Sequence, residues 1–301
     1  MLGEVENPRP GEGEVVIDVE AAGLCHSDVS VLTEPTAGKT MMPFTPMIIG
    51  HEIAGTISAV GEGVTEWTVG DRVGVCPTAS ASIPGYTRHG GFAEQHLAPA
   101  ADLVRVPDDV DIALGALATD AGMTSYHAVV VRGAVQAGMK VGVIGLGGLG
   151  QVGARVAVLK GAEVHVAEMK KDVWPLAKEL GVIDTVADAA EWAGAGLDLV
   201  VDNAGFDTTL KALEAVRSGG TVVQVGMGDP NVRITVQSIL ANKSLLGSMG
   251  GTKDDIAALY ELMRAGDLQP AWAEIAFEDI AEGVARLEAG TVTGRLVARL
   301  R

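Results

Sequence analysis

The chain has 301 residues, and 48% of them are hydrophobic, which is enough to bury the cores of two ordinary domains and excludes a disordered chain. Its 22 basic and 39 acidic residues give a formal net charge of −17, and a surface of that sign repels phosphate backbones, so we expect no nucleic-acid partner. No stretch has the ~18 apolar residues of a membrane span, the first residues lack the basic and apolar segments of a signal peptide, and two cysteines make no disulfide framework. We therefore expect a cytoplasmic protein with no membrane partner.

The first third of the chain predicts short strands separated by glycine-rich turns. Residues 14–23 alternate between apolar and polar side chains, and residues 53–61 and 71–76 continue with short apolar runs. These features predict a β-rich, barrel-like domain.

From about residue 111 the pattern becomes an alternation of helices and strands. Residues 113–131 have helical spacing. After them, strands are expected at 141–144, 163–168, 197–205, 219–226 and 244–250, with helices at 147–160 and 172–181. Such alternation favours a parallel sheet covered on both faces. The tail, residues 273–300, is typical of strand, helix and strand, and could return to the first domain.

Residues 145–150, GLGGLG, follow an expected strand and open an expected helix. Gly145, Gly147 and Gly150 fit the G-x-G-x-x-G pattern of a dinucleotide-binding Rossmann fold, and Glu168 ends the next strand, where a carboxylate would accept hydrogen bonds from the ribose hydroxyls. A carboxylate there favours NAD over NADP, because it repels a 2′-phosphate. The alternatives are a glycine-rich turn that only packs a helix on a sheet, and an acid that is simply solvated at a strand end.

Cys25 is one of only two cysteines and lies beside a histidine, a serine and an aspartate in AAGLCHSDVS, residues 21–30. A buried thiol, a nucleophile and a metal ligand are all possible for it. His51 in GHE, residues 50–52, offers a nitrogen donor suited to zinc, although a histidine after glycine is often only a turn residue.

The order GLCHSD, GHE-x-x-G, GDRV and GLGGLG resembles the zinc-dependent medium-chain alcohol dehydrogenases, and the resemblance runs from residue 6 to residue 297. It implies an α/β chain with a GroES-like catalytic domain at 1–121, an NAD-binding Rossmann domain at 122–248, and a return segment at 249–301 that completes the catalytic domain.

The resemblance also implies a catalytic zinc held by Cys25 and His51, with Asp120 of TDAG at the third ligand position. Glu52 would be a neighbouring acid that can approach the zinc. Asp120 could instead cap a helix or pair with a base. Only Cys76 follows GDRV and no Cys-x-x-Cys occurs, so we expect one catalytic zinc and no structural zinc.

The remaining site residues also come from the resemblance. Ser27 would take the proton of the substrate hydroxyl, while Ser30 stands where many relatives have a histidine that ends the relay. The cofactor site would comprise His26, Thr124, Gly145, Gly147, Gly148, Leu149, Gly150, Glu168, Gly226, Met249 and Arg295. His26 and Arg295 would face the pyrophosphate and Thr124 the nicotinamide. Val31, Phe44 and Met249 are candidates for lining the substrate pocket.

The resemblance implies an NAD-dependent oxidoreductase that interconverts a medium-sized secondary alcohol and its ketone, as a homodimer or homotetramer. One alternative is a zinc-free quinone or enoyl reductase of the same superfamily, which would lack the Cys/His/acid set. The other is a nucleotide-binding protein without catalysis.

Overall fold

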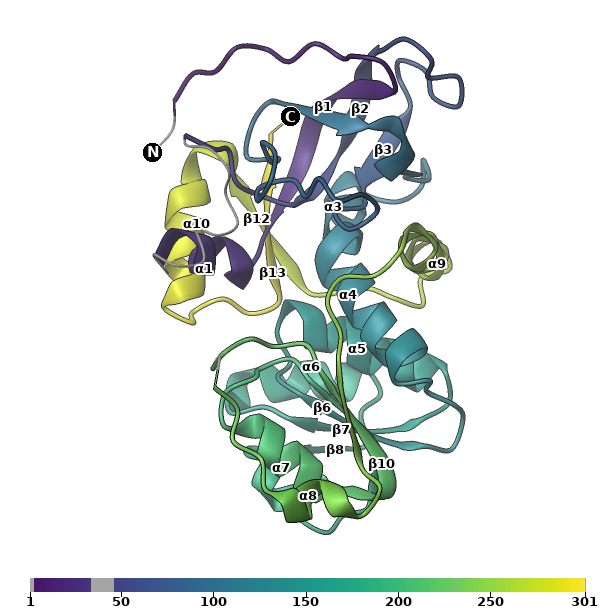
Figure 1. The fold of residues 1–301 in the computed structure, drawn as a ribbon, viewed down its shortest axis with the longest axis vertical. Helices are drawn as coiled ribbons and strands as arrows, with labels where there is room; N and C mark the ends of the chain where they lie inside the picture. The colour runs from purple at the N-terminus through teal and green to yellow at the C-terminus, as the bar shows by residue number, and fades with distance from the viewer. Residues whose placement is uncertain (1–2, 34–45, 230, 301) are drawn as a thin grey trace. The chain divides into compact units, whose positions relative to one another are not determined.

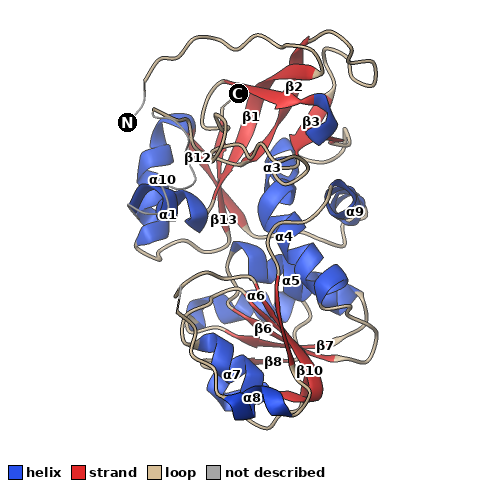
Figure 2. Ribbon diagram, in the orientation of Figure 1, coloured by secondary structure: helices blue, strands red, loops and turns tan. Residues whose placement is uncertain are grey.

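The computed structural model describes residues 3–33, 46–229 and 231–300. The chain divides into two compact units, Met1–Met123 with Thr252–Arg301, and Thr124–Gly251. Each unit is built around its own β-sheet (Figures 1 and 2). The first unit is discontinuous in sequence, so both ends of the chain contribute to one sheet.

Over the residues that the structure describes, the sheet of the first unit has seven strands and is mostly antiparallel. The strands follow the order β12-β13-β1-β2-β3-β5, and β4 also pairs with β1. Only the β12–β13 pair is parallel among the pairs described. The strands are β1 (Glu14–Leu24), β2 (Glu52–Val60), β3 (Arg72–Val75), β4 (Gln95–Pro99), β5 (Leu103–Arg105), β12 (Trp272–Ala276) and β13 (Arg295–Arg299).

Strand β1 is central because it pairs with β2, β4 and β13. Its alternating apolar residues Val15, Ile17 and Val19 are fully buried, and they join Ile53 and Ile57 of β2 in one core. The return strand β13 pairs antiparallel with β1, with Leu24 opposite Leu296. The tail therefore completes the first sheet, as its strand–helix–strand pattern suggested.

The helix predicted at 113–131 forms as a series of shorter segments. The π-helical segment Ala118–Gly122 follows α3 (Ile112–Leu117), and a second, His127–Arg132, follows α4 (Met123–Tyr126). A π-segment fits one extra residue into a turn, and such turns are frequent at functional sites.

The other helices of this unit are α1 (His26–Thr33), α9 (Lys253–Arg264) and α10 (Ile280–Glu288), with 3₁₀ turns at Ala100–Asp102 and Phe277–Asp279. Helix α9 is absent from the sequence-based expectations, although Thr252 and Asp255 form a capping box at its start.

The sheet of the second unit has six strands, and all its described pairs are parallel. The strand order is β11-β10-β9-β6-β7-β8. From β6 the chain first adds strands on one side, β7 and β8, and then on the other, β9 to β11, so the switch point of this doubly wound sheet lies between β6 and β9. The strands are β6 (Lys140–Ile144), β7 (Glu163–Ala167), β8 (Asp184–Val186), β9 (Leu197–Asp202), β10 (Val216–Gln224) and β11 (Ser244–Gly247). The helices are α5 (Gly148–Leu159), α6 (Trp174–Glu179), α7 (Thr208–Ala215) and α8 (Val236–Leu240), with 3₁₀ turns at Lys171–Val173 and Ala189–Trp192.

A mainly antiparallel sheet in one unit and a doubly wound parallel sheet in the other confirm the predicted α/β fold class. Within the described ranges, no helix combines the length and the apolar character needed to cross a bilayer.

His96 on β4 gives the fold a dependence on pH. Its side chain is 1% exposed and its Nδ1 lies 3.3 Å from the carbonyl oxygen of Gly90, while its Nε2 has no hydrogen-bond partner among the described residues. Burial, helped by the nearby Arg88 guanidinium, lowers the pKa of His96 to about 3. Between about pH 6.5 and pH 3, His96 is therefore protonated in the unfolded chain but neutral in the folded chain.

We expect this histidine to destabilise the fold as the pH falls from about 6.5 towards 3. At pH 5 the cost is about 2 kcal/mol, from 1.36 kcal/mol per pKa unit. The His96→Leu variant cannot take up that proton, so its urea midpoint should fall less between pH 7 and pH 5 than that of the parent. Equal falls in the two proteins would contradict the assignment.

Candidate metal and cofactor sites

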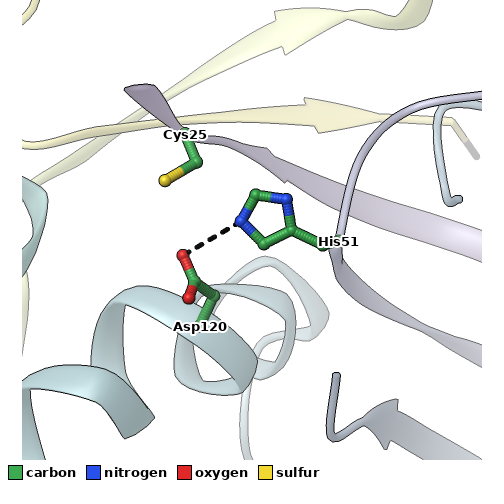
Figure 3. Close-up of side chains that lie close together, drawn as sticks. All are labelled: Cys25, His51 and Asp120. Carbon is green, nitrogen blue, oxygen red and sulfur yellow. Dashed lines mark hydrogen bonds and ion pairs between the residues drawn. The ribbon is translucent and has the colours of Figure 1, made fainter. Parts of the chain in front are cut away.

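Cys25, His51 and Asp120 come together in the first unit. Cys25 directly follows β1 and His51 directly precedes β2, and these strands pair antiparallel with Gly23 opposite Glu52. This register brings the two residues to the same end of the sheet. Asp120 projects from the π-helical segment, and all three side chains point towards one another (Figure 3). Their donor atoms all lie within 4.8 Å of one another.

The geometry and chemistry of this group fit zinc. Thiolate, imidazole and carboxylate are zinc ligands, and bonds of about 2.0–2.3 Å at tetrahedral angles put ligand atoms about 3.3–3.8 Å apart. Nε2 of His51 lies 3.3 Å from Oδ2 of Asp120. Cys25 is 7% exposed and His51 5% exposed, so the donors are shielded from water. Among the residues described, this is the one cluster of at least three His, Cys, Asp or Glu donors close enough to share a metal ion.

Asp28 is a buried member of the site that the sequence analysis did not assign. Its carboxylate is 2% exposed, accepts a 2.9 Å hydrogen bond from the Cys25 amide, and places Oδ1 3.3 Å from Nδ1 of His51. A carboxylate on one imidazole nitrogen orients the other nitrogen towards a metal. Asp28 therefore directs Nε2 of His51 towards Asp120. Its place in CHSD, three residues after Cys25, was the available signal.

Glu52 and Arg295 form a buried ion pair behind Asp120. Nε of Arg295 lies 2.8 Å from Oε2 of Glu52, and a second guanidinium nitrogen lies 3.0 Å from Oδ2 of Asp120. Glu52 is fully buried, Arg295 is 3% exposed, and the Ala121 amide donates to the other oxygen of Glu52 at 2.9 Å. The Glu52 carboxylate lies against the backbone of Gly23, where a side-chain Cβ would overlap it, so glycine at this position leaves room for Glu52. The contact of Arg295 with cofactor pyrophosphate stays a prediction.

The charges of the site are strongly coupled. Burial opposes protonation of His51, yet the carboxylates of Asp28 and Asp120 outweigh it and raise its pKa well above the usual value. Burial raises the pKa of Glu52 to about 7, although Arg295 opposes the change. Burial would also raise the pKa of Asp120, but His51 and Arg295 hold it well below its usual range. Among the described residues of the site, the only permanent cation is Arg295, whereas the groups that can carry negative charge are one thiol and three carboxyls: Cys25, Asp28, Glu52 and Asp120. This excess of acidic groups favours the binding of a divalent cation.

The other predicted residues around Cys25 occupy the start of α1. The half-buried Ser27 places its hydroxyl oxygen 3.6 Å from the Cys25 sulfur. His26 is exposed and Val31 is 6% exposed. The Ser30 hydroxyl donates to the carbonyl oxygen of His26 at 3.3 Å, which is an ordinary contact within a helix. Phe44 lies outside the described residues.

The glycine-rich loop of the second unit lies between β6 and α5. Gly145 has a φ of +81°, which suits glycine, and a Cβ on Gly150 would overlap the backbone of Gly145. The Glu168 carboxylate accepts a 2.7 Å hydrogen bond from the Leu146 amide and a 2.8 Å bond from the Lys170 amide. Glu168, which was predicted from its position at the end of the next strand, therefore lies against the glycine-rich loop.

The remaining predicted cofactor residues take varied positions. Gly147 precedes α5, and Gly148, Leu149 and Gly150 form its first turn. Thr124 is 6% exposed and Met249 is 80% exposed. Gly226 follows β10, and a Cβ there would overlap the backbone at Asn203 and Ala204.

Two family models match the chain. Residues 11–108 match the alcohol dehydrogenase GroES-like domain, and residues 148–265 match the zinc-binding dehydrogenase family. An alcohol dehydrogenase of Geobacillus stearothermophilus is 31% identical over an alignment of 328 residues that covers 99% of this chain and 95% of that protein.

Solved structures of similar proteins agree with these matches. An acetophenone reductase from Geotrichum candidum, solved in complex with NAD, has a TM-score of 0.92 and 30% identity, and covers 100% of this chain and 93% of its own. A cobalt- and zinc-bound thermostable alcohol dehydrogenase from Pyrobaculum aerophilum has a TM-score of 0.89 and 26% identity, covering 100% of this chain and 95% of its own. With its GroES-like and parallel-sheet units and its full-length similarity to alcohol dehydrogenases, the chain belongs to the zinc-dependent medium-chain alcohol dehydrogenase family.

Proposed function

We propose that this chain transfers a hydride between NAD and a medium-sized secondary alcohol, with one catalytic zinc held by Cys25, His51 and Asp120. The reaction class is NAD-dependent alcohol oxidoreduction, as in the relatives it matches. The observation that carries the zinc assignment is the convergence of a thiol, an imidazole and a carboxylate within 4.8 Å. We further propose that this ion is the only zinc of the chain.

Three protein ligands leave a fourth position for the alcohol or ketone oxygen, as a catalytic zinc site requires. When bound, zinc supplies Lewis-acid polarisation of that oxygen, and NAD supplies the hydride acceptor. The chain's own groups set the geometry. Asp28 orients His51 through Nδ1, and Arg295 holds Asp120 and Glu52 in place through its guanidinium.

Ser27 is the residue we assign to proton transfer. Its hydroxyl oxygen lies 3.6 Å from the Cys25 sulfur, so it would be close to a substrate oxygen held at the proposed zinc site. A hydroxyl can accept the substrate proton while it donates its own, and the charge need not rest on the serine. Glu52 is assigned to the support of Asp120.

The nucleotide is assigned to the second unit, at the end of β6. The backbone of Gly145, Gly147, Gly148, Leu149 and Gly150 would approach the pyrophosphate, at the free amides of the α5 N-terminus. Thr124 would lie against the nicotinamide, and Gly226 and Met249 would border the nucleotide. His26 and Arg295 of the first unit are proposed to face the pyrophosphate.

We expect NAD to be preferred over NADP by about tenfold or more in kcat/KM. The Glu168 carboxylate already accepts two amide hydrogen bonds and has about two lone pairs left for the ribose hydroxyls, whereas a 2′-phosphate would meet it as a like charge. The measurement is kcat/KM with each cofactor for the parent and for Glu168→Gln, in which the preference should narrow. Equal or better use of NADP by the parent would remove Glu168 from this role.

Replacing Ser27 by alanine should lower kcat by about 10²-fold or more, the range for a lost proton transfer. Zinc content and NAD affinity should stay unchanged, because the hydroxyl is proposed to hold neither. Thr33→Ala is the matched control on the same helix, since the Thr33 hydroxyl donates to the Val29 carbonyl oxygen at 2.9 Å and has no assigned role in the reaction. A Ser27→Ala variant with the parent's turnover would exclude Ser27 from the relay.

A screen of primary and secondary alcohols and of ketones tests the proposed function as a whole. The protein is assayed with NAD and with NADP, as purified, after chelation and after zinc is restored. We expect turnover of secondary alcohols that is lost on chelation and regained with zinc. Full activity in metal-free protein would support a zinc-free reductase, and a lack of turnover with every substrate would support a nucleotide-binding protein without catalysis.

The wider organisation is also proposed. We assign residues 1–121 and the return segment 249–301 to the catalytic domain and 122–248 to the NAD-binding domain.

Strand β11 is an edge strand, and near it Ile234, Val236, Leu240 and Leu245 are exposed. An exposed apolar edge favours pairing with a second copy, so we propose a homodimer or homotetramer in the cytoplasm.

A further inference from the structure

Thr119 connects the two chain segments that carry His51 and Asp120. It directly precedes Asp120 in the π-helical segment, and its side chain is fully buried. Its hydroxyl oxygen accepts a hydrogen bond from the Ile53 amide at 3.2 Å. Since Ile53 stands two residues after His51 on β2, this one side chain bonds the neighbourhood of one proposed zinc ligand to that of another.

The contact lies where the pairing of β2 with β3 ends. The described pairing begins with Ala54 opposite Gly74, so Ile53 is the residue just beyond it. A buried amide without a hydrogen-bond partner destabilises a fold, and the Thr119 hydroxyl supplies a partner for the Ile53 amide. The π-helical segment is thereby held against β2 at the residue before Asp120.

The orientation of the Thr119 side chain is fixed by two further contacts. Its hydroxyl donates to the Ala116 carbonyl oxygen at 2.7 Å, about one turn earlier in the helix. Its methyl group lies close to Gly74 on β3, where a Cβ would overlap both that methyl and the Tyr260 hydroxyl. A β-branched side chain has few rotamers, and the contacts of the hydroxyl and the methyl together select one of them.

A second hydrogen bond joins the same two segments in the opposite direction. The Ala121 amide donates to Oε1 of Glu52 at 2.9 Å. The first bond runs from the backbone of β2 to the side chain before Asp120, and the second runs from the backbone after Asp120 to the side chain after His51. Asp120 is therefore held on both flanks, at a position that leaves its Oδ2 3.3 Å from Nε2 of His51.

We propose that Thr119 is a positioning residue of the zinc site, whose hydroxyl sets the spacing between His51 and Asp120 before the metal binds. The inference rests on the proposed function, because His51 and Asp120 have their roles as ligands there. The hydroxyl is engaged with Ile53 and Ala116, so it acts through the two segments and not on the metal. An ion binds most tightly to ligands that already lie at the required separation, since no rearrangement then opposes binding.

The test compares the metal site in Thr119→Val and Thr119→Ser. The valine variant keeps the branched shape and removes the hydroxyl, whereas the serine variant keeps the hydroxyl and removes the methyl. We expect Thr119→Val to lower zinc affinity by about tenfold or more, measured by competition with a chelator, and Thr119→Ser to restore an affinity close to that of the parent. The visible absorption bands of the cobalt-substituted protein should shift in Thr119→Val and not in Thr119→Ser, because they report the arrangement of ligands around the metal.

Thr209→Val is the matched control in the second unit. Its buried hydroxyl donates to Oε1 of Gln224 at 2.8 Å, so its loss should lower the urea midpoint and leave zinc affinity and the cobalt bands unchanged. If Thr119→Val does not fold, Thr119→Ala compared with Thr119→Ser removes the same hydroxyl and gives the same readouts.

Parent-like zinc affinity and cobalt bands in Thr119→Val, or an equal loss of affinity in the valine and serine variants, would overturn the proposal and leave the zinc assignment in place. A parent protein that binds neither zinc nor cobalt would overturn the zinc assignment itself and this inference with it.

Discussion

Replacing Asp120 by alanine is expected to remove zinc from the protein and to abolish alcohol turnover. The carboxylate is the third donor of the cluster and lies 3.3 Å from the His51 nitrogen. A catalytic zinc site has three protein ligands, and the variant would keep only two. Loss of partners outside the ligand shell alone weakens metal binding by about 10–100-fold, so loss of a ligand should exceed that. The measurement is elemental analysis together with zinc affinity by chelator competition.

Two controls separate ligand loss from other effects. Asp109→Ala removes an exposed carboxylate that pairs with Arg264, and zinc and turnover should stay as in the parent. Glu52→Gln removes a charge behind the ligands and should disturb Arg295 more than zinc content. Parent-like zinc affinity in Asp120→Ala would transfer the third-ligand role to Glu52 or to water, and a metal-free protein with full activity would overturn the zinc mechanism.

Replacing Arg295 by methionine is expected to destabilise the first unit by about 3–5 kcal/mol, the cost of breaking a buried ion pair by removing one partner. Arg295 is 3% exposed and its guanidinium contacts two carboxylates, one of them fully buried. Without it, burial raises the pKa of Glu52 still further, so this carboxyl either takes up a proton or stays charged with no permanent cation beside it, and both cost stability. The measurement is urea unfolding of chelator-treated protein, so that zinc does not contribute.

Arg299 supplies the matched control on the same strand. It pairs with Glu274 and Asp111, whose side chains are about half exposed, and such pairs contribute about 0–1 kcal/mol. Arg299→Met should therefore have a small effect. In the double variant Glu52→Gln with Arg295→Met, part of the lost stability should return, because one uncompensated charge is gone. Equal effects of the two arginine substitutions would show that Arg295 is not the electrostatic centre of the site.

Much of the fold follows from local patterns in the sequence. Alternation in residues 14–23 predicted β1, and the glycine-rich loop predicted the β6–α5 turn, because both patterns depend on neighbouring residues. The segmentation of the helix after residue 111 was not predictable, since nothing local marks the π-helical segment that carries Asp120. Helix α9 had a capping box in the sequence, which the apolar periodicity alone did not reveal.

The site was predictable only in part, for a similar reason. Cys25, His51 and Asp120 were selected through a resemblance of motifs, and the structure brings them together. Asp28 was not selected although it stands three residues after Cys25, because the contact that gives it a role is with His51, outside its own segment. Arg295 was expected at the pyrophosphate, and its pairing with Glu52 spans 243 residues, a separation at which no spacing rule operates.

The position of β13 in the first sheet sets an order for folding during synthesis. This strand lies between β12 and β1, and it leaves the ribosome only after the whole of Thr124–Gly251. The second unit is continuous in sequence, so it can complete its sheet while the tail is still being made. Until Arg295 arrives, the nascent first unit has an open edge along β1 and an unpaired Glu52. During that interval the open β1 edge can pair with other chains, and Asp120 lacks its contact with Arg295.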